Sequence, residues 1–320
     1  MQLKLSQYRF RVLSTFLILG VCVFCFSLIL SSYYTGGDQS IYNKVYDEIV
    51  GLSFSEAILM YKFNINYEEP IHFLVVWFFS NLGVSKSLLM GLSNCILIFY
   101  LIKIFVRLKV NVYIISLVIL TNFYLYVLFF AAERLKFGFI FFLIFMDLGA
   151  TYFKRYLYLI MSFLAHFQMI FFPVIYLFSN IKKYVSNLKN ILLIVLLSPI
   201  GIYFLFFFQE HIVGKYESYS LLANSNTIIK NIWQPFFFMV CTLFYTKKIS
   251  HILQIFFVII LFSALLGPDR ITMIAYIYFM YFSLRVNNGI NFGVIISSAY
   301  YGIKTVFFIY NILYFNNGFA

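Results

Sequence analysis

Long apolar runs recur along this whole sequence, and they constrain its fold more than any other feature. Most runs have roughly the 20 residues that an α-helix needs to cross a hydrocarbon core about 30 Å thick. Charged residues make up only 11% of the 320 positions, whereas a soluble domain has about 25%. Because a helix satisfies its backbone hydrogen bonds internally, the runs predict an all-α, polytopic transmembrane helical bundle, a single integral membrane domain over residues 1–320.

Lysine and arginine gather at the ends of the apolar runs, and this distribution predicts how the chain is oriented. Lys4, Arg9 and Arg11 precede the first run, so the N-terminus is expected in the cytoplasm. Further cation clusters that mark the same side lie at 103–109, 154–155 and 247–248. The formal net charge of +12 follows from this placement, so the sequence does not indicate nucleic acid as a partner.

The connection after the first run, residues 33–70, holds six of the chain's 11 acidic residues. It is expected to be a periplasmic insert, with a second periplasmic loop over 209–234. The apolar segment 70–82 is too short to cross the core comfortably, so it is expected to be a re-entrant or interfacial helix. Glu69 stands at its cap position and Pro70 is its first residue, as is favoured at a helix start.

The remaining apolar runs and the positive-inside rule give about nine or ten crossings. The segment 156–179 has cations on both sides, so it either crosses or dips into the membrane and returns. A return would require a break near His166 to Gln168 or at Pro173. Full spans are expected at about 12–32, 86–106, 110–131, 134–153, 190–208, 235–246, 251–266, 270–285 and 290–314.

This topology brings the unusual polar side chains to the outer ends of helices. An arginine fork binds phosphate oxygens, and a carboxylate or imidazole can accept the proton of an attacking hydroxyl. Such a cluster suits a sugar carried on a lipid pyrophosphate. The residues are Asp38, Glu68, Glu69, Arg134, Glu210, His211, Asp269 and Arg270, with His166 below them.

Structural roles stay open for three of these positions. Arg134 could simply pair with Glu133, His166 could bond a neighbouring helix, and Asp269 could be a helix cap beside Arg270. The sequence has no dense metal-binding motif, nucleophile elbow or phosphate-cradling loop, which argues against hydrolases, kinases and ATP-driven proteins.

Short motifs follow one another in a fixed order over residues 33–285. A Gly-Asp pair is followed by spaced tyrosines, and a Glu-Pro helix start by a short segment that ends in Leu-Gly-x-Ser. An arginine then opens a helix, a histidine precedes a proline in an apolar helix, and a late arginine opens another helix. The positions are Gly37-Asp38, Tyr42, Tyr46, Glu69-Pro70, Leu82 to Ser85, Arg134, His166, Pro173 and Arg270.

In order and spacing these motifs resemble the Wzy-type polymerases of O-antigen and capsule repeat units, most closely the EpsG-like group of exopolysaccharide membrane proteins. The chain departs from that pattern at Leu135 and Ile71, where the family often has glutamine and glycine. The resemblance implies a multi-pass, GT-C-like glycosyltransferase of the bacterial inner membrane. It would polymerise undecaprenyl-pyrophosphate-linked oligosaccharides at the periplasmic face and require no cofactor.

The resemblance also implies roles for individual residues. Donor and acceptor would both be lipid-linked oligosaccharides, and the expected partners are the bilayer, a chain-length regulator and a flippase. His166 is the first choice for the proton acceptor and Asp38 the second, because imidazole titrates near neutral pH. The expected catalytic residues are His166, Asp38 and Glu69, and the expected substrate-binding residues are Arg134, Arg270, Tyr42, Tyr46, Glu68 and His211.

Two other functions fit the same residues. A lipid-linked glycan flippase or other transporter also needs a basic cavity, although it usually shows paired halves and charges near the middle of the membrane. An O-antigen ligase would use a similar donor and differ in its acceptor.

Overall fold

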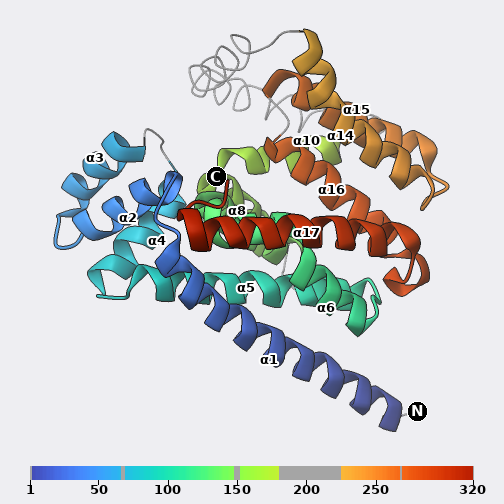
Figure 1. Cartoon of the computed structure of the whole chain (residues 1–320), viewed down its shortest axis with the longest axis horizontal. Helices are drawn as coiled ribbons and strands as arrows, with labels where there is room; N and C mark the ends of the chain where they lie inside the picture. The colour runs from blue at the N-terminus through green and yellow to red at the C-terminus, as the bar shows by residue number, and fades with distance from the viewer. Residues whose placement is uncertain (1, 66–68, 148–151, 180–224, 267–268, 320) are drawn as a thin grey trace. The chain divides into compact units, whose positions relative to one another are not determined.

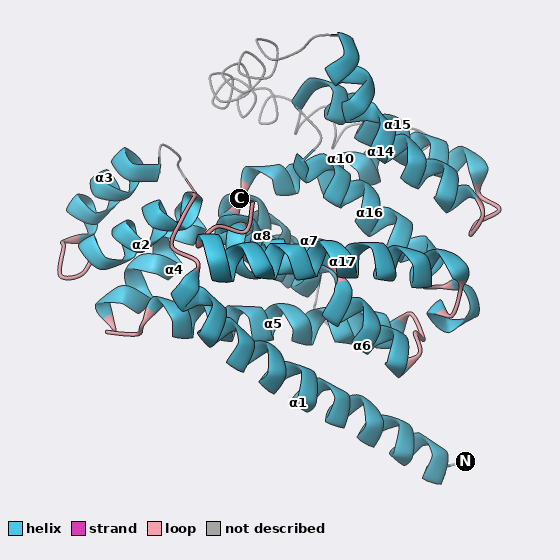
Figure 2. Cartoon of the chain, in the orientation of Figure 1, coloured by secondary structure: helices cyan, strands magenta, loops and turns pink. Residues whose placement is uncertain are grey.

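The computed structural model describes residues 2–65, 69–147, 152–179, 225–266 and 269–319. Throughout these ranges the regular structure is helical and no strand occurs (Figure 2). The chain divides into two compact units. The first contains residues 1–170 and 287–320, the second contains residues 171–286, and each is described by itself.

Two long antiparallel helices form one side of the first unit (Figure 1). α1 spans Gln2–Tyr33 and α5 spans Lys86–Arg107. Asn94 of α5 donates from Nδ2 to the Ser27 hydroxyl of α1 at 2.9 Å. The C-terminal end of α1 therefore lies beside the N-terminal end of α5, and the segment that connects them must begin and finish at this end of the pair.

That connecting segment was expected to be a polar insert and a short helix, and it consists of three helices. They are α2 Asp38–Glu48, α3 Phe54–Ile65 and α4 Pro70–Asn81. α2 forms because Gln39, Tyr42 and Tyr46 recur at helical spacing and are all buried on one face. Gly37 has φ of 58°, which favours glycine, and it turns the chain out of α1. α4 confirms the predicted short helix with proline in its first turn.

The predicted straight span 110–131 is bent by 60°. It contains α6 Val112–Thr121, the four-residue α7 Phe123–Tyr126 and the π-helix η1 Val127–Ala131. Asn122 causes the break, because its side-chain oxygen accepts the amide hydrogens of Tyr124 and Leu125 and so begins a new helix. The π-helix leaves backbone carbonyls of Phe129 and Phe130 able to accept side-chain donors.

The remaining helices of the first unit are α8 Glu133–Met146, α9 Tyr152–Ala165, the 3₁₀ turn η2 Phe167–Ile170 and α17 Phe292–Phe315. α8 approaches both α9 and η2 closely at Gly138, where a β-carbon would come within 3.3 Å of the Ser162 carbonyl oxygen of α9 and 2.6 Å of Met169 Cγ of η2. The interruption between α9 and η2 falls at His166, one of the two places where the sequence predicted a break.

The described residues of the second unit form α10 Phe171–Ser179, α14 Ser225–Leu243, α15 Ile249–Leu266 and α16 Asp269–Ser283. The rings of Phe238 and Tyr276 meet at 5.5 Å, which packs α14 on α16. α14 begins at Ser225, within the predicted periplasmic loop 209–234, and runs through Pro235; the periplasmic placement of that loop stays a prediction. The span predicted for 190–208 lies outside the described residues.

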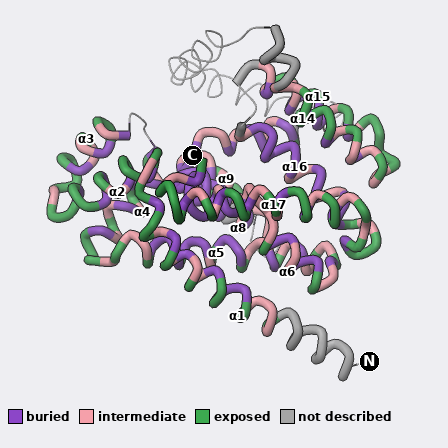
Figure 3. The backbone as a smooth tube through the Cα atoms, viewed as in Figure 1, coloured by how far each residue is buried: buried purple, intermediate pink, exposed green. Residues whose placement is uncertain are grey.

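Three of the described helical segments are long and apolar enough to cross a membrane, namely Leu13–Tyr33, Lys86–Arg107 and Val286–Phe315. The bent segment from Val112 to Ala131 would be a fourth. Exposed positions recur along these helices (Figure 3). They include large apolar residues, for example Ile18 at 63% and Val306 at 66% exposure. Such surfaces fit a helical membrane protein, and the predicted count of nine or ten crossings stays a prediction.

Candidate functional site

Four segments of the first unit bring polar side chains together in a buried chain of contacts. Glu69 precedes α4, Arg134 opens α8, Tyr42 lies on α2 and His166 follows α9. All four residues are between 5% and 8% exposed. We call them the His166 network, and its members are separated by up to 124 positions in the sequence, from 42 to 166.

Glu69 is the centre of the His166 network. One carboxylate oxygen, Oε1, lies 2.5 Å from His166 Nδ1, and the other, Oε2, lies 3.0 Å from Arg134 Nη1. Arg134 also donates from Nε to the Tyr42 hydroxyl at 2.7 Å. Because a carboxylate can only accept, the proton between Glu69 and His166 is on Nδ1.

Local structure explains why these side chains reach one another. Pro70 fixes the first turn of α4 and leaves Glu69 just before it. His166 lies in the interruption between α9 and η2, where its backbone carbonyl accepts the Met169 amide. The Gly138 contact holds η2 close to α8 and therefore to Arg134 near the start of that helix.

Opposite charges determine the ionisation of Glu69. Burial by itself would raise the pKa of this carboxyl, but the charge and hydrogen bond of His166, together with the charge of Arg134, lower the pKa to about 2. Glu69 is therefore ionised at neutral pH. Burial raises the pKa of Tyr42 to about 12 despite the nearby charge of Arg134, so the phenol stays neutral and accepts the arginine N–H.

The second nitrogen of His166 faces away from Glu69. Nε2 lies 3.3 Å from the side-chain oxygen of Gln168, and because that oxygen can only accept, the contact is a hydrogen bond only while Nε2 carries a proton. A carboxylate behind an imidazole fixes its orientation and stabilises its protonated form. His166 is thus placed as a general acid or base whose reactive nitrogen is Nε2.

A second buried chain of contacts lies beside the first, and we call it the Glu133 network. The Tyr61 hydroxyl is 2.7 Å from His72 Nδ1, and His72 Nε2 is 3.4 Å from Glu133 Oε1. Lys86 Nζ lies 3.2 Å from Glu133 Oε2 and donates to Gln39 Oε1 at 2.9 Å. These contacts tie α2, α3 and α4 to α5 and α8.

The two networks meet at adjacent residues and at one aromatic ring. Glu133 and Arg134 are neighbours in α8, and the Tyr42 ring has Lys86 Nζ at 5.5 Å and the Arg134 guanidinium at 5.7 Å from its centroid. His72 contacts the same ring at 5.8 Å between centroids. The Glu133 network therefore holds the helices that supply Tyr42 and Glu69.

The structure unites four of the residues predicted from sequence and leaves others apart. Asp38 is exposed at the start of α2, and the Tyr46 hydroxyl donates to the Val84 carbonyl at 2.7 Å, a contact between α2 and the turn before α5. Arg270 opens α16 in the second unit, so its predicted place beside Arg134 stays a prediction. Glu68 and His211 lie outside the described residues.

Sequence reasoning missed most of the Glu133 network. Lys86 carried the same signal as Arg134, since it is a cation that opens a helix on the expected outer side. His72 follows Glu69 by three positions, which places both near one face of the first turn of α4. Glu133 was considered only as a partner of Arg134, and in the structure it pairs with Lys86 and His72.

No group of histidine, cysteine and acidic residues that could hold a metal ion occurs within the part of the chain that the structure describes. Comparison with protein-family models, curated proteins and solved structures returns no match.

Proposed function

We propose that this chain is a multi-pass, GT-C-like glycosyltransferase of the bacterial inner membrane that polymerises oligosaccharide repeat units carried on a polyprenyl pyrophosphate. The observation that supports the proposal is the His166 network, in which a carboxylate holds a histidine on one oxygen and an arginine on the other. The residues come from four segments of a chain with several apolar helices. Proton transfer and recognition of a phosphate are the two tasks for which this set is suited.

His166 is the proton acceptor in this proposal, and Glu69 is a positioning residue. The acceptor sugar hydroxyl approaches Nε2, on the side of the ring where Gln168 now lies. As the hydroxyl oxygen attacks the anomeric carbon of the donor, its proton moves to Nε2. The ionised Glu69 stabilises the imidazolium that results.

Arg134 binds the pyrophosphate of the donor lipid. In the reaction the bond between the anomeric carbon and the pyrophosphate oxygen breaks, and the leaving oxygen keeps the electron pair. Arginine suits this role because its planar fork can donate two parallel hydrogen bonds to phosphate oxygens. Tyr42 fixes the guanidinium through Nε, and the pyrophosphate takes the place that Glu69 now occupies at Nη1.

The bond between sugar and pyrophosphate supplies the driving force, so the proposed transfer needs no other energy source. The products are the elongated lipid-linked chain and the free polyprenyl pyrophosphate. Catalysis then depends on holding two lipid-linked glycans in line and on stabilising charge that develops at the leaving group.

Product analysis of the purified chain tests this proposal. The protein is reconstituted in liposomes with purified lipid-linked repeat units, and the glycans are separated by size after incubation. The proposal predicts a ladder of multiples of the unit. A flippase would move the units between leaflets without a new linkage, and a ligase would produce conjugates only after its own acceptor is added. Either result without a ladder would refute polymerisation.

A further inference from the structure

Lys136 is a fully buried cation that the proposed reaction does not use. It lies in the first two turns of α8 and has 0% exposure. Its Nζ is 3.0 Å from Met90 Sδ and 3.4 Å from the Phe129 carbonyl oxygen. It forms no ion pair with a carboxylate of the described residues. Its Nζ also lies 5.9 Å from the centroid of the Phe137 ring, and the carboxylate whose charge acts on it, Glu133, is shared with Lys86. A buried ammonium with no carboxylate of its own is costly unless another negative charge is near.

The charges around Lys136 do not balance. Two fully or nearly buried cations, Arg134 and Lys136, and the 13% exposed Lys86 lie with two buried carboxylates, Glu69 and Glu133; the only further carboxylate that acts on Lys86, among the described residues, is the exposed Asp47. One positive charge is left over even when every histidine is neutral. Since Glu69 and Glu133 each already pair with another cation, the surplus is at Lys136.

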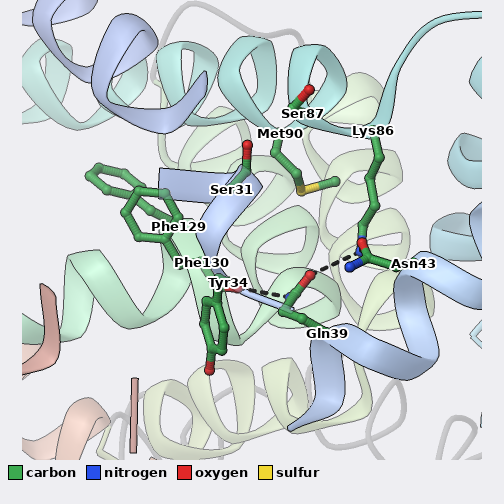
Figure 4. Close-up of a pocket in the computed structure, with 9 residues that line it drawn as sticks. All are labelled: Ser31, Tyr34, Gln39, Asn43, Lys86, Ser87, Met90, Phe129 and Phe130. Atoms are coloured by element: carbon green, nitrogen blue, oxygen red, sulfur yellow. Dashed lines mark hydrogen bonds between the residues drawn. The ribbon is translucent and has the colours of Figure 1, made fainter. Parts of the chain in front are cut away.

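A small cavity lies beside Lys86 (Figure 4). Its volume is about 40 Å³, and its polar lining comes from Ser31, Tyr34, Gln39, Asn43, Lys86 and Ser87. Met90 and Phe129 line it as well. Both of these residues also contact Lys136 Nζ, so the cavity and that ammonium share two neighbours.

Hydrogen bonding within the cavity leaves donors available. Lys86 Nζ donates to the side-chain oxygens of Gln39 at 2.9 Å and of Asn43 at 2.8 Å. The Gln39 amide nitrogen donates in turn to the Phe130 carbonyl at 2.8 Å. The oxygen of Asn43 is therefore occupied, whereas its amide N–H groups and the Ser87 hydroxyl can donate to a ligand. This polarity favours an anion.

We propose that the cavity binds one small inorganic anion, such as chloride, which supplies the missing negative charge beside Lys86 and Lys136. The volume would hold roughly three waters, so it accommodates a single ion with a water and is too small for a sugar ring or a pyrophosphate. The proposal depends on the buried charges and the cavity, and it stands whether or not the chain is a glycosyltransferase.

Thermal unfolding of the purified chain in nanodiscs tests the site. The unfolding temperature is measured in sodium chloride and in sodium gluconate of equal ionic strength, with inorganic phosphate as a third series. At ten times its Kd, chloride should raise the unfolding temperature by about 2 °C over gluconate, along a saturable curve. Equal temperatures in chloride and gluconate would overturn the proposal, as expected if Lys136 loses its proton instead.

Two substitutions locate the effect. Lys136→Met keeps the length of the side chain and removes the surplus charge, so it should lose the chloride response and unfold in gluconate no lower than the wild type. Lys44→Met is the matched control, because Lys44 has a 58% exposed side chain and should keep the full response. A full chloride response in Lys136→Met would contradict the proposal.

A partly exposed cavity residue provides a second test that does not depend on folding of the Lys136 variant. Asn43→Ala removes the amide donors, so the chloride concentration at half effect should rise by about tenfold. An unchanged half-effect concentration would mean that the ion binds elsewhere.

Discussion

Replacing Glu69 by glutamine removes the charge at the centre of the His166 network while keeping the size of the side chain. The glutamine oxygen can accept from either His166 or Arg134, so one of them loses its partner in a site where both are less than 10% exposed. Removing one partner of a buried ion pair costs about 3 to 5 kcal/mol. The oxygen that glutamine retains favours the lower limit of this range. For a chain of 320 residues, about 3 kcal/mol lowers the unfolding temperature by roughly 4 to 5 °C.

The same substitution should affect the reaction more than the fold. Without the carboxylate charge the protonated form of His166 is no longer stabilised, and its ring also loses its Nδ1 partner whenever the glutamine oxygen accepts from Arg134, so transfer should fall by about 100- to 10,000-fold. Both effects are measured on protein in nanodiscs, by thermal unfolding and by the initial rate of polymer formation well below the new unfolding temperature.

Glu48→Gln is the matched control for this experiment. The Glu48 side chain is 49% exposed and lies 4.0 Å from Lys44, so losing its charge should cost less than about 1 kcal/mol and leave transfer unchanged. An unfolding temperature of Glu69→Gln equal to that of Glu48→Gln would refute the burial argument. A transfer rate within twofold of the wild type would refute the positioning role.

Three further predictions follow from the same contacts. Arg134→Lys keeps the charge and loses the fork, so transfer should fall by about 10- to 1,000-fold, or about 1.4 to 4 kcal/mol, and a near-normal rate would exclude the pyrophosphate contact. Gly138→Ala places a β-carbon 2.6 Å from Met169 Cγ, so it should destabilise the protein by about 1 to 3 kcal/mol. The resulting shift of η2 should also lower the transfer rate. An unchanged unfolding temperature would show that the Met169 side chain moves aside without cost. Acid should also weaken the fold, because folding lowers the pKa of Glu69 from 4.5 to about 2. Between these two values the unfolded chain binds a proton that the folded chain does not. Stability on the order of 3 kcal/mol is therefore lost as the pH falls from about 5 to 2. Glu69→Gln should unfold with a weaker dependence on pH over that interval, and an unchanged dependence would contradict this assignment.

Single residues of the site could be predicted from the sequence because each leaves a local signal. Arg134 is a cation on the side that the orientation bias disfavours, His166 interrupts an apolar run, and Glu69 precedes a proline at a helix start. Their mutual contacts could not be predicted, since they depend on how α4, α8 and α9 pack. That packing is determined by close contacts such as Gly138 against Met169, which leave no periodic signal in the sequence.

Two errors in the predicted elements have physical explanations. The segment after α1 is predicted as a polar insert because of its acidic residues. The spacing of Gln39, Tyr42 and Tyr46 also fits a helix with one buried face, and this helix is α2. The run 110–131 was taken as one span because its hydropathy is continuous. A hydropathy profile does not detect helix caps. Asn122 is the C-cap of α6, and its side-chain oxygen caps the N-terminus of α7.

The central claim is that His166 accepts the proton of the acceptor hydroxyl, and single-turnover transfer by His166→Asn tests it most directly. The measurement uses purified lipid-linked units at saturating concentration over a range of pH, with His251→Asn in α15 of the second unit as the matched control. The account predicts a loss of at least about 100-fold for His166→Asn, a wild-type rate for His251→Asn, and disappearance of the ascending acid limb of the pH profile in the first variant alone. Transfer by His166→Asn at the rate and pH dependence of the wild type would contradict it.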